Sequence, residues 1–217
     1  MDYVISPPPQ VSVPVVGLDA RFPVHRVYCV GRNYADHVAE MGGDPKSEPP
    51  VFFSKPASAL VTDGEAVRYP QATSDLHHEV ELVVALASGG RDLTLAEAAA
   101  CVYGYGVGID FTRRDLQSIA KKHGRPWDTA KGFDQSAPLS ALTPKANFAQ
   151  STNTPICLTV NDELRQSSLL GQMIWSVAEI IEQLSRLFEL KAGDIIYTGT
   201  PAGVAAVVKG DKLCGEI

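Results

Sequence analysis

The chain has 217 residues, a length that suits one domain with a short N-terminal extension. Hydrophobic residues make up 45% of it and charged residues 20%, and the formal net charge is -6. This acidic balance, with Lys and Arg scattered along the chain, excludes nucleic acid as the main partner. The basic pairs Arg113-Arg114 and Lys121-Lys122 lie in a polar helical stretch and are interpreted as a solvated helix face. No apolar run approaches the roughly 20 residues of a membrane helix, so no membrane partner is expected.

The cysteine pattern points to a reducing environment. None of the four cysteines forms a CxxC pair or has a histidine at zinc-finger spacing. The opening residues, MDYVISPPPQ, lack the basic and apolar regions of a signal peptide. We therefore expect a cytoplasmic protein.

The first half of the chain is predicted to contain an extended arm, four short strands and three helices. Residues 1–25 are rich in Pro and Val, which predicts an extended arm with a short strand or two. Thr94 and Glu97 have the spacing of a capping box at the start of a helix. Strands are predicted at 26–30, 51–54, 77–87 and 104–111, and helices at 32–41, 95–103 and 112–124.

The second half has fewer regular elements. Apolar residues at helical spacing predict an amphipathic helix at 174–188, and strands are predicted at 156–160 and 194–198. Asn161-Asp162 is typical of a hairpin turn. Because short strands outnumber helices without regular βαβ alternation, we predict an α+β fold, with a catalytic domain at 26–217 after the arm.

Two glutamates separated by one residue give the strongest local signal for a metal site. Glu79 and Glu81 would project from the same side of a strand that becomes strongly apolar directly afterwards. Two such carboxylates repel each other and are costly to desolvate, and a divalent cation would relieve both problems. The alternative is a solvent-facing strand edge with two ordinary glutamates, and the spacing leaves both interpretations open.

Asp110 supplies a possible third carboxylate, at the end of a predicted strand. By itself it could simply cap the helix that follows. Together with Glu79 and Glu81 it forms an all-oxygen set, which suits Mg²⁺, Mn²⁺ or Ca²⁺ better than zinc.

Three other segments carry candidate functional groups. His37 and Glu40 share a helix face, which suits a general base oriented by a carboxylate, or else an exposed surface pair; the flanking glycines make that helix a possible lid. Lys131 could stabilise an oxyanion near a metal, although a solvated lysine is the simpler interpretation. The loop at 197–201 could present backbone N–H groups and a hydroxyl to a carboxylate, or could be only a turn.

Together these segments resemble the fumarylacetoacetate hydrolase superfamily, most closely its small acylpyruvate and fumarylpyruvate hydrolases. The resemblance runs in the family's order from about residue 26 to 215. It implies a mixed β-roll flanked by a few helices, usually in a homodimer, with a further strand beyond the last residue here. The matching stretches are VYCVGRNYADHVAEMG, PPVFFSKP, LHHEVELVVAL, GYGVGIDFTRRDLQ, KKHGRPWDTAKGFDQSAPL, VNDELRQ and GDIIYTGTPAGV.

The resemblance also implies a role for each matched residue. Glu79, Glu81 and Asp110 match the ligands of Mg²⁺ or Mn²⁺, and His37 and Glu40 match the dyad that activates water. Lys131 matches the lysine beside the metal. Positions in motifs that surround the substrate are Arg32, Lys55, Gln117 and Thr200.

The implied reaction is hydrolysis of a carbon–carbon bond in an acylpyruvate, giving pyruvate and a carboxylic acid. Oxaloacetate decarboxylation is the nearest alternative, because it needs the metal and the lysine but no attacking water. Isomerisation of a 2-oxo-dienoate acid is another possibility on the same site. A non-catalytic protein that binds 2-oxo acids is the alternative from a different class.

Overall fold

The computed structural model describes residues 2–34, 49–149 and 151–217, and it has an α+β fold, as predicted. Its largest sheet has six strands in the order β11-β8-β7-β14-β3-β4. The β14–β3 pair is parallel and the other pairs in this sheet are antiparallel, so the sheet is mixed. Its strands are β3 (Val27–Gly31), β4 (Val51–Lys55), β7 (Val80–Leu86), β8 (Val102–Ile109), β11 (Thr143–Pro144) and β14 (Ile195–Tyr197).

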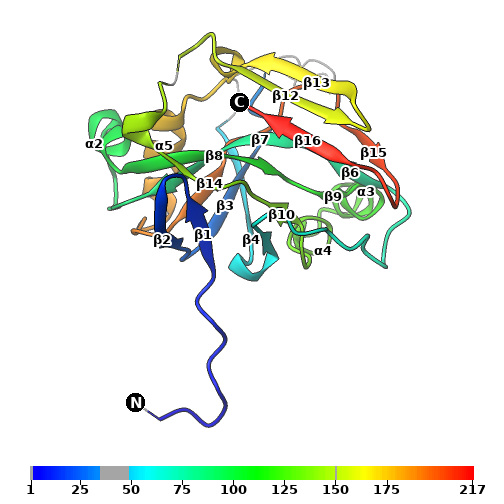
Figure 1. Cartoon of the computed structure of the whole chain (residues 1–217), viewed down its shortest axis with the longest axis horizontal. Helices are drawn as coiled ribbons and strands as arrows, with labels where there is room; N and C mark the ends of the chain where they lie inside the picture. Colours follow the sequence, from blue (N-terminus) through cyan, green and yellow to red (C-terminus); the bar gives the residue numbers. More distant parts are fainter. Residues whose placement is uncertain (1, 35–48, 150) are drawn as a thin grey trace.

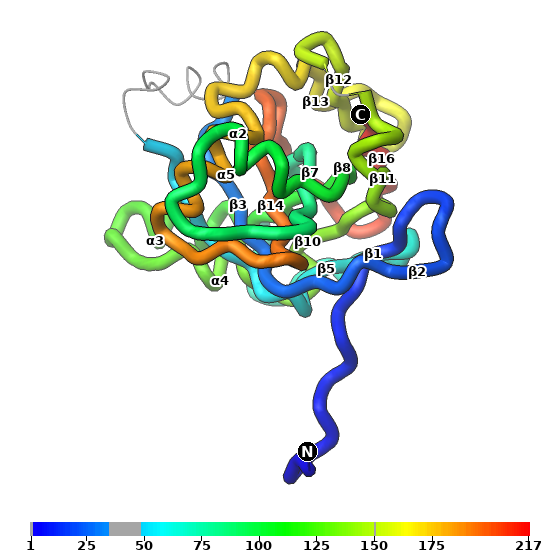
Figure 2. Tube along the Cα trace, turned by 90° about the vertical axis from the view of Figure 1, so that its left-hand side faces the viewer, coloured from blue at the N-terminus to red at the C-terminus, as the bar shows by residue number. Residues whose placement is uncertain are grey.

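Strand β7 lies at the centre of the molecule and is buried along its whole length. Because side chains alternate along a strand, Leu82 and Val84 enter one hydrophobic core, while Val83 and Ala85 enter another on the opposite face. The first core is covered by α2 and α5, which pack together on one side of the sheet (Figure 2). This double-sided burial explains the continuous apolar run in the sequence.

The strand predicted at 77–87 is divided in two at Glu79. Strand β6 (Leu76–His78) pairs with β9 and β15, whereas β7 pairs with β8 and β14. The chain therefore passes from one sheet to another at Glu79, a change that depends on distant pairing partners. The remaining sheets contain β1 (Ser12–Val15) with β2 (Leu18–Pro23), β5 (Leu60–Val61) with β10 (Ala137–Pro138), β6 with β9 (Thr112–Arg113) and β15 (Ala205–Val207), and β12 (Pro155–Val160) with β13 (Glu163–Leu169) and β16 (Leu213–Glu216).

The described helices that were predicted begin within three residues of the expected positions, but the helix predicted at 95–103 ends at Ala100 because Val102 and Tyr103 belong to β8. The capping box of Thr94 with Glu97 is present, and a second one, formed by Ser176 and Glu179, starts the amphipathic helix. The helix predicted at 112–124 begins two residues later, because Thr112 and Arg113 pair with β6 as a strand. The α-helices are α2 (Leu95–Ala100), α3 (Arg114–Lys122), α4 (Asp128–Lys131) and α5 (Val177–Leu187), and short 3₁₀ helices occur at Ala57–Ala59, Lys145–Asn147 and Leu170–Gln172.

The predicted hairpin turn at Asn161-Asp162 joins β12 to β13. Both residues have positive φ, at 52° and 66°, which is the geometry of a type I′ turn. Asn and Asp tolerate this left-handed conformation better than most residues, which is why the pair signals a hairpin.

The N-terminal residues before β1 extend away from the rest of the molecule (Figures 1 and 2). The β1–β2 hairpin that follows packs into the second core through Val13, Val15 and Phe22. Residues 32–34 are not helical, and the rest of the helix predicted at 32–41, with its proposed lid function, lies outside the described residues. No helix in the described ranges is long and apolar enough to cross a membrane.

Candidate metal centre

The strand register brings Glu79, Glu81 and Asp110 together. Strands β7 and β8 are antiparallel, with Val80 opposite Ile109, so Glu79 and Asp110 lie side by side where the pair ends. The Asp110 N–H donates to the Glu79 carbonyl at 2.8 Å. One carboxylate oxygen from each of the three residues lies within 4.8 Å of the others, a spacing that could hold a metal ion.

These three carboxylates are almost completely removed from water. Glu79 is 6% exposed, Glu81 1% and Asp110 0%. A buried carboxylate costs several kcal/mol unless a cation or strong hydrogen bonds compensate it. The interpretation of two ordinary glutamates on a solvated strand edge is therefore wrong.

Lys131 is buried against two of the carboxylates. Its Nζ lies 2.8 Å from Glu79 Oε2 and 2.7 Å from Asp110 Oδ2, and the residue is only 3% exposed. Burial opposes the charge on the ammonium, but the negative charges of Asp110 and Glu79 outweigh this effect and raise the pKa of Lys131. The simpler interpretation of Lys131 as a solvated lysine is wrong.

Lys55 forms a second buried cation on the other side of Asp110. Its Nζ lies 2.8 Å from Asp110 Oδ1 and donates to the backbone carbonyls of Phe111 and Lys131. With these contacts, Lys55 connects the end of β4 to Asp110 and to the segment that carries Lys131. Its ammonium is thus engaged with the protein itself.

Arg114 belongs to the same cluster, although the sequence suggested a solvated residue. Its guanidinium contacts Glu79 Oε1 and also donates to Gln117 Oε1 at 2.6 Å. Thr112 donates to the same Glu79 oxygen at 3.1 Å. The signal that could have identified Arg114 is its spacing of three from Gln117, which places both side chains on one face of α3.

The neighbouring cations contact the three carboxylates unequally, and this difference shifts the pKa values of Glu79 and Glu81 in opposite directions. Burial would raise the pKa of Glu79, but Lys131 and Arg114 outweigh it and lower that pKa. Burial raises the pKa of Glu81, and the negative charges of Asp110 and Glu79 raise it further. Glu81 has no ion pair among the described residues, and its Oε2 accepts only the Gly199 N–H, at 2.7 Å. A hard cation bound by the three oxygens fits this environment, because it would neutralise Glu81 as well.

The loop after β14 closes one side of the site. Besides the Gly199 N–H that reaches Glu81, the Thr200 hydroxyl donates to the Val80 carbonyl at 2.8 Å. Gly199 has a φ of 99°, and a side chain there would collide with Asn33, so glycine is required. The loop thus presents a backbone N–H to a carboxylate, and that carboxylate belongs to the protein.

Gln166 on β13 holds the chain on both sides of Glu79. Its Oε1 accepts the Val80 N–H at 3.0 Å and lies 2.9 Å from His78 Nδ1. Its Nε2 donates to the Thr200 hydroxyl at 2.8 Å and to the Pro201 carbonyl at 2.9 Å. The sequence analysis found the motif VNDELRQ but gave this glutamine no role, because none of its partners is nearby in sequence.

Two of the three carboxylates, Glu79 and Glu81, line a small cavity of about 30 Å³. Three of the four predicted substrate-contact residues line it, and Lys55 does not. The cavity is lined by Glu79, Glu81 and Lys131 together with Arg32, Arg114, Gln117, Lys121, Trp127 and Thr200.

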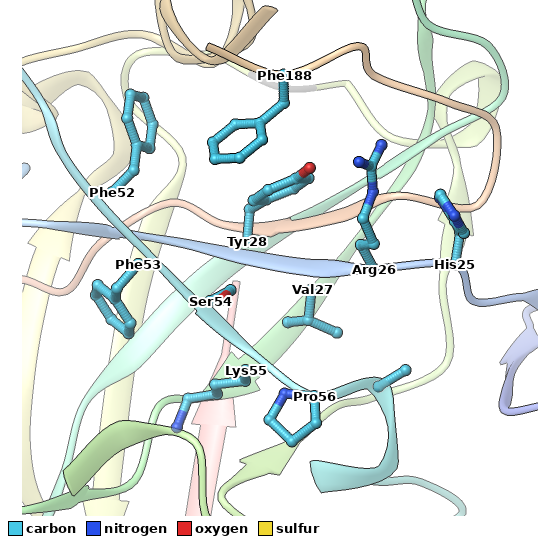
Figure 3. A pocket seen from close by; sticks show the side chains of 11 residues that line it. His25, Arg26, Val27, Tyr28, Phe52, Phe53, Ser54, Lys55, Pro56 and Phe188 are labelled. Atoms are coloured by element: carbon cyan, nitrogen blue, oxygen red, sulfur yellow. The ribbon is translucent and has the colours of Figure 1, made fainter. Parts of the chain in front are cut away.

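A larger cavity of about 470 Å³ lies beside β3 and β4. Figure 3 shows the rings of Tyr28, Phe52 and Phe188 around it, with the Lys55 ammonium turned away from them. Glu79, Glu81 and Asp110 do not line this cavity, so the candidate centre belongs to the smaller one. His37 and Glu40, the predicted dyad, lie outside the described residues.

Comparison with known proteins agrees with this geometry. The family model for the C-terminal domain of fumarylacetoacetate (FAA) hydrolase matches residues 26–217. The chain therefore belongs to the fumarylacetoacetate hydrolase family, and the predicted family and fold are confirmed.

Several relatives are similar over nearly their whole length. A fumarylpyruvate hydrolase from Pseudomonas aeruginosa, solved with Mn²⁺ and pyruvate, superposes with a TM-score of 0.95 at 48% identity, over 99% of this chain and 94% of that one. The oxaloacetate tautomerase YcgM of Escherichia coli (strain K12) is 43% identical over 88% of both chains. A fumarylpyruvate hydrolase from Ralstonia sp is 42% identical over 80% of this chain and 90% of the relative.

Proposed function

We propose that this chain is a divalent-metal-dependent hydrolase that cleaves the carbon–carbon bond of acylpyruvates such as fumarylpyruvate. The products would be pyruvate and a carboxylic acid. One observation carries the proposal: three buried carboxylates converge beside a buried lysine, in a chain with 48% identity to a fumarylpyruvate hydrolase solved with Mn²⁺ and pyruvate.

Glu79, Glu81 and Asp110 would hold Mg²⁺ or Mn²⁺. When bound, such a cation supplies a Lewis acid for the 2-oxo acid end of the substrate. Lys131, fixed between Glu79 and Asp110, keeps a positive charge next to this end and stabilises the pyruvate enolate as the bond breaks.

His37 and Glu40 are assigned to water activation on the strength of the family motif. His37 takes a proton from water, and the hydroxide attacks the distal acyl carbonyl. The bond between that carbonyl and the methylene of the pyruvate unit then breaks. The proton finally goes to the methylene carbon and gives pyruvate.

Arg32, Gln117 and Thr200 are proposed to contact the substrate, because they line the cavity beside the carboxylates. Lys55 is assigned a different role from that implied by its motif. Its ammonium is occupied by Asp110 and two backbone carbonyls, so it would act on the substrate only by holding Asp110.

The direct test follows the enol absorbance of fumarylpyruvate and acetylpyruvate with Mn²⁺ or Mg²⁺, and again with excess EDTA. We expect metal-dependent loss of absorbance with one pyruvate formed per substrate consumed. Glu81→Gln and Asp110→Asn should abolish turnover and Mn²⁺ binding while the circular dichroism spectrum stays native. Hydrolysis that persists in EDTA-treated enzyme would overturn the metal requirement.

Oxaloacetate is the second candidate substrate, because relatives with 43% and 46% identity are named oxaloacetate tautomerases and one with 40% identity an oxaloacetate decarboxylase. Enolisation and decarboxylation pass through an enolate and need no attacking water. The His37→Ala variant separates the two chemistries: it should lose acylpyruvate hydrolysis more than a thousandfold and retain measurable decarboxylation. Unchanged hydrolysis in this variant would refute His37 as the base.

The proposed enzyme is a cytoplasmic homodimer that acts on a small 2-oxo acid. Light scattering during size-exclusion chromatography should give twice the chain mass of 23.2 kDa.

A further inference from the structure

The cavity beside the carboxylates is lined by more cationic side chains than form ion pairs with the carboxylates. Four cationic side chains line it: Arg32, Arg114, Lys121 and Lys131. Lys131 pairs with Glu79 and Asp110, and Arg114 pairs with Glu79. Within the described ranges, neither Arg32 nor Lys121 forms an ion pair. In a protein of net charge -6, two cations at one cavity that have no ion pair with any described residue indicate a site for an anion.

Lys121 is held on the cavity side of α3 by an aromatic contact. Its Nζ lies 5.2 Å from the centre of the Trp127 ring, and Trp127 in turn packs against Phe53 at 5.9 Å. Both rings line the same cavity. Lys121 and the neighbouring Lys122 are both exposed, but Lys122 lines no described cavity, so the two adjacent lysines differ in what they face.

The surroundings of the Lys121 ammonium are themselves positive. Partial desolvation lowers the pKa of Lys121, and the nearby charges of Arg114 and Arg32 lower it further. An anion bound between these groups would relieve their repulsion.

Arg32 is fixed at the cavity in an unfavourable backbone conformation. Its φ is 60°, in the left-handed region that non-glycine residues rarely adopt. The next residue, Asn33, is fully buried, and its side chain binds the Trp175 N–H and the carbonyls of Trp175 and Thr198 at 2.7–3.0 Å. Backbone strain maintained by its surroundings is concentrated at functional sites.

We propose that Lys121 and Arg32 bind a second carboxylate on the substrate, at the end of the acyl group farthest from the 2-oxo acid. The proposal rests on the hydrolase function above and defines its substrate class as acylpyruvates with a carboxylated acyl chain. Trp127 and Phe53 provide an apolar wall for the carbons between the two acidic ends. Acylpyruvates with a neutral acyl end would lack this interaction.

The test compares fumarylpyruvate, which carries the distal carboxylate, with acetylpyruvate, which does not. Lys121→Met keeps the length of the side chain and removes its charge. It should lower kcat/KM for fumarylpyruvate about tenfold, mainly through KM, and change kcat/KM for acetylpyruvate less than twofold. Lys121→Arg should restore most of the loss. Lys122→Met is the matched control and should behave like the wild type on both substrates.

Salt provides a second measurement. The preference of the wild type for fumarylpyruvate should fall as the ionic strength rises, and in Lys121→Met it should depend less on salt, because only the Arg32 charge remains. Equal losses on both substrates, or no loss on either, would overturn the distal carboxylate site and leave the hydrolase function intact. A wild-type enzyme that hydrolyses neither substrate would instead refute the hydrolase function, and the distal site with it.

Discussion

Gln166 shows how a residue that lies far in sequence from the candidate metal ligands helps to define their position. Its amide binds the residues on both sides of Glu79 and also the Thr200 loop that closes the site. Because the chain changes sheets at Glu79, no continuous strand holds that carboxylate in place. Partners that orient metal ligands commonly change metal affinity by 10–100-fold when they are removed.

Replacing Gln166 by Leu should therefore weaken Mn²⁺ binding by about tenfold, because the β6–β7 break and the Thr200 loop lose their common anchor. Isothermal titration calorimetry on the folded apoprotein measures the effect. The exposed Gln172→Leu, in a 3₁₀ helix away from the carboxylates, is the control and should bind Mn²⁺ like the wild type. Unchanged affinity in Gln166→Leu would show that Glu79 is positioned without this amide.

At the scale of elements, the start of α3 is tied to the loop before β6 by Asp115. Its carboxylate accepts the Thr73 hydroxyl at 2.7 Å and the Ser74 N–H at 3.1 Å. Partial burial opposes ionisation, but these bonds and the Leu116 N–H outweigh it and lower the pKa of Asp115. The same helix carries Arg114, so this connection also supports the site.

The lowered pKa predicts a pH-dependent contribution to stability. As the pH falls, the unfolded chain binds a proton at Asp115 near the ordinary pKa of 3.8, whereas the folded chain binds it only at a lower pH. The stabilising contribution of Asp115 is therefore complete above pH 3.8 and is lost as the pH falls through the lowered pKa of the folded state. Asp115→Asn should reduce the free energy of unfolding by about 1 kcal/mol at pH 7. The difference should shrink below about pH 4.

Urea denaturation between pH 7 and pH 3.5 measures this difference, with the exposed Asp19→Asn as the control. A difference between the wild type and Asp115→Asn that stayed constant down to pH 3.5 would mean that the Asp115 hydrogen bonds do not depend on its charge.

At the scale of the whole molecule, the site lies where several sheets meet. Glu79 joins the six-stranded sheet to the β15-β6-β9 sheet, and Gln166 on the β13-β12-β16 sheet contacts both sides of it. The carboxylates at this junction are buried, and within the described residues Glu81 has only a backbone hydrogen bond. Metal binding should therefore stabilise the entire fold.

Mn²⁺ at a hundredfold excess over its Kd should stabilise the protein by about 2.7 kcal/mol, which for a chain of this size raises Tm by about 5–10 °C. Differential scanning fluorimetry with Mn²⁺ and with EDTA measures the shift. Glu81→Gln should reduce it to nearly zero, because one of three ligands is lost. A full shift in that variant would place the metal elsewhere.

The sequence by itself determined the family, the α+β class, the hairpin at Asn161-Asp162 and the carboxylate set, because each depends on local spacing or on extended motifs. Only the tertiary structure decided that Lys131 is buried, that Arg114 pairs with Glu79 and that Gln166 clamps the chain around it. These contacts join residues 35 to 88 positions apart, so they depend on strand register and on the passage of the chain between sheets. Local sequence patterns contain no information on strand register or on where the chain passes from one sheet to another.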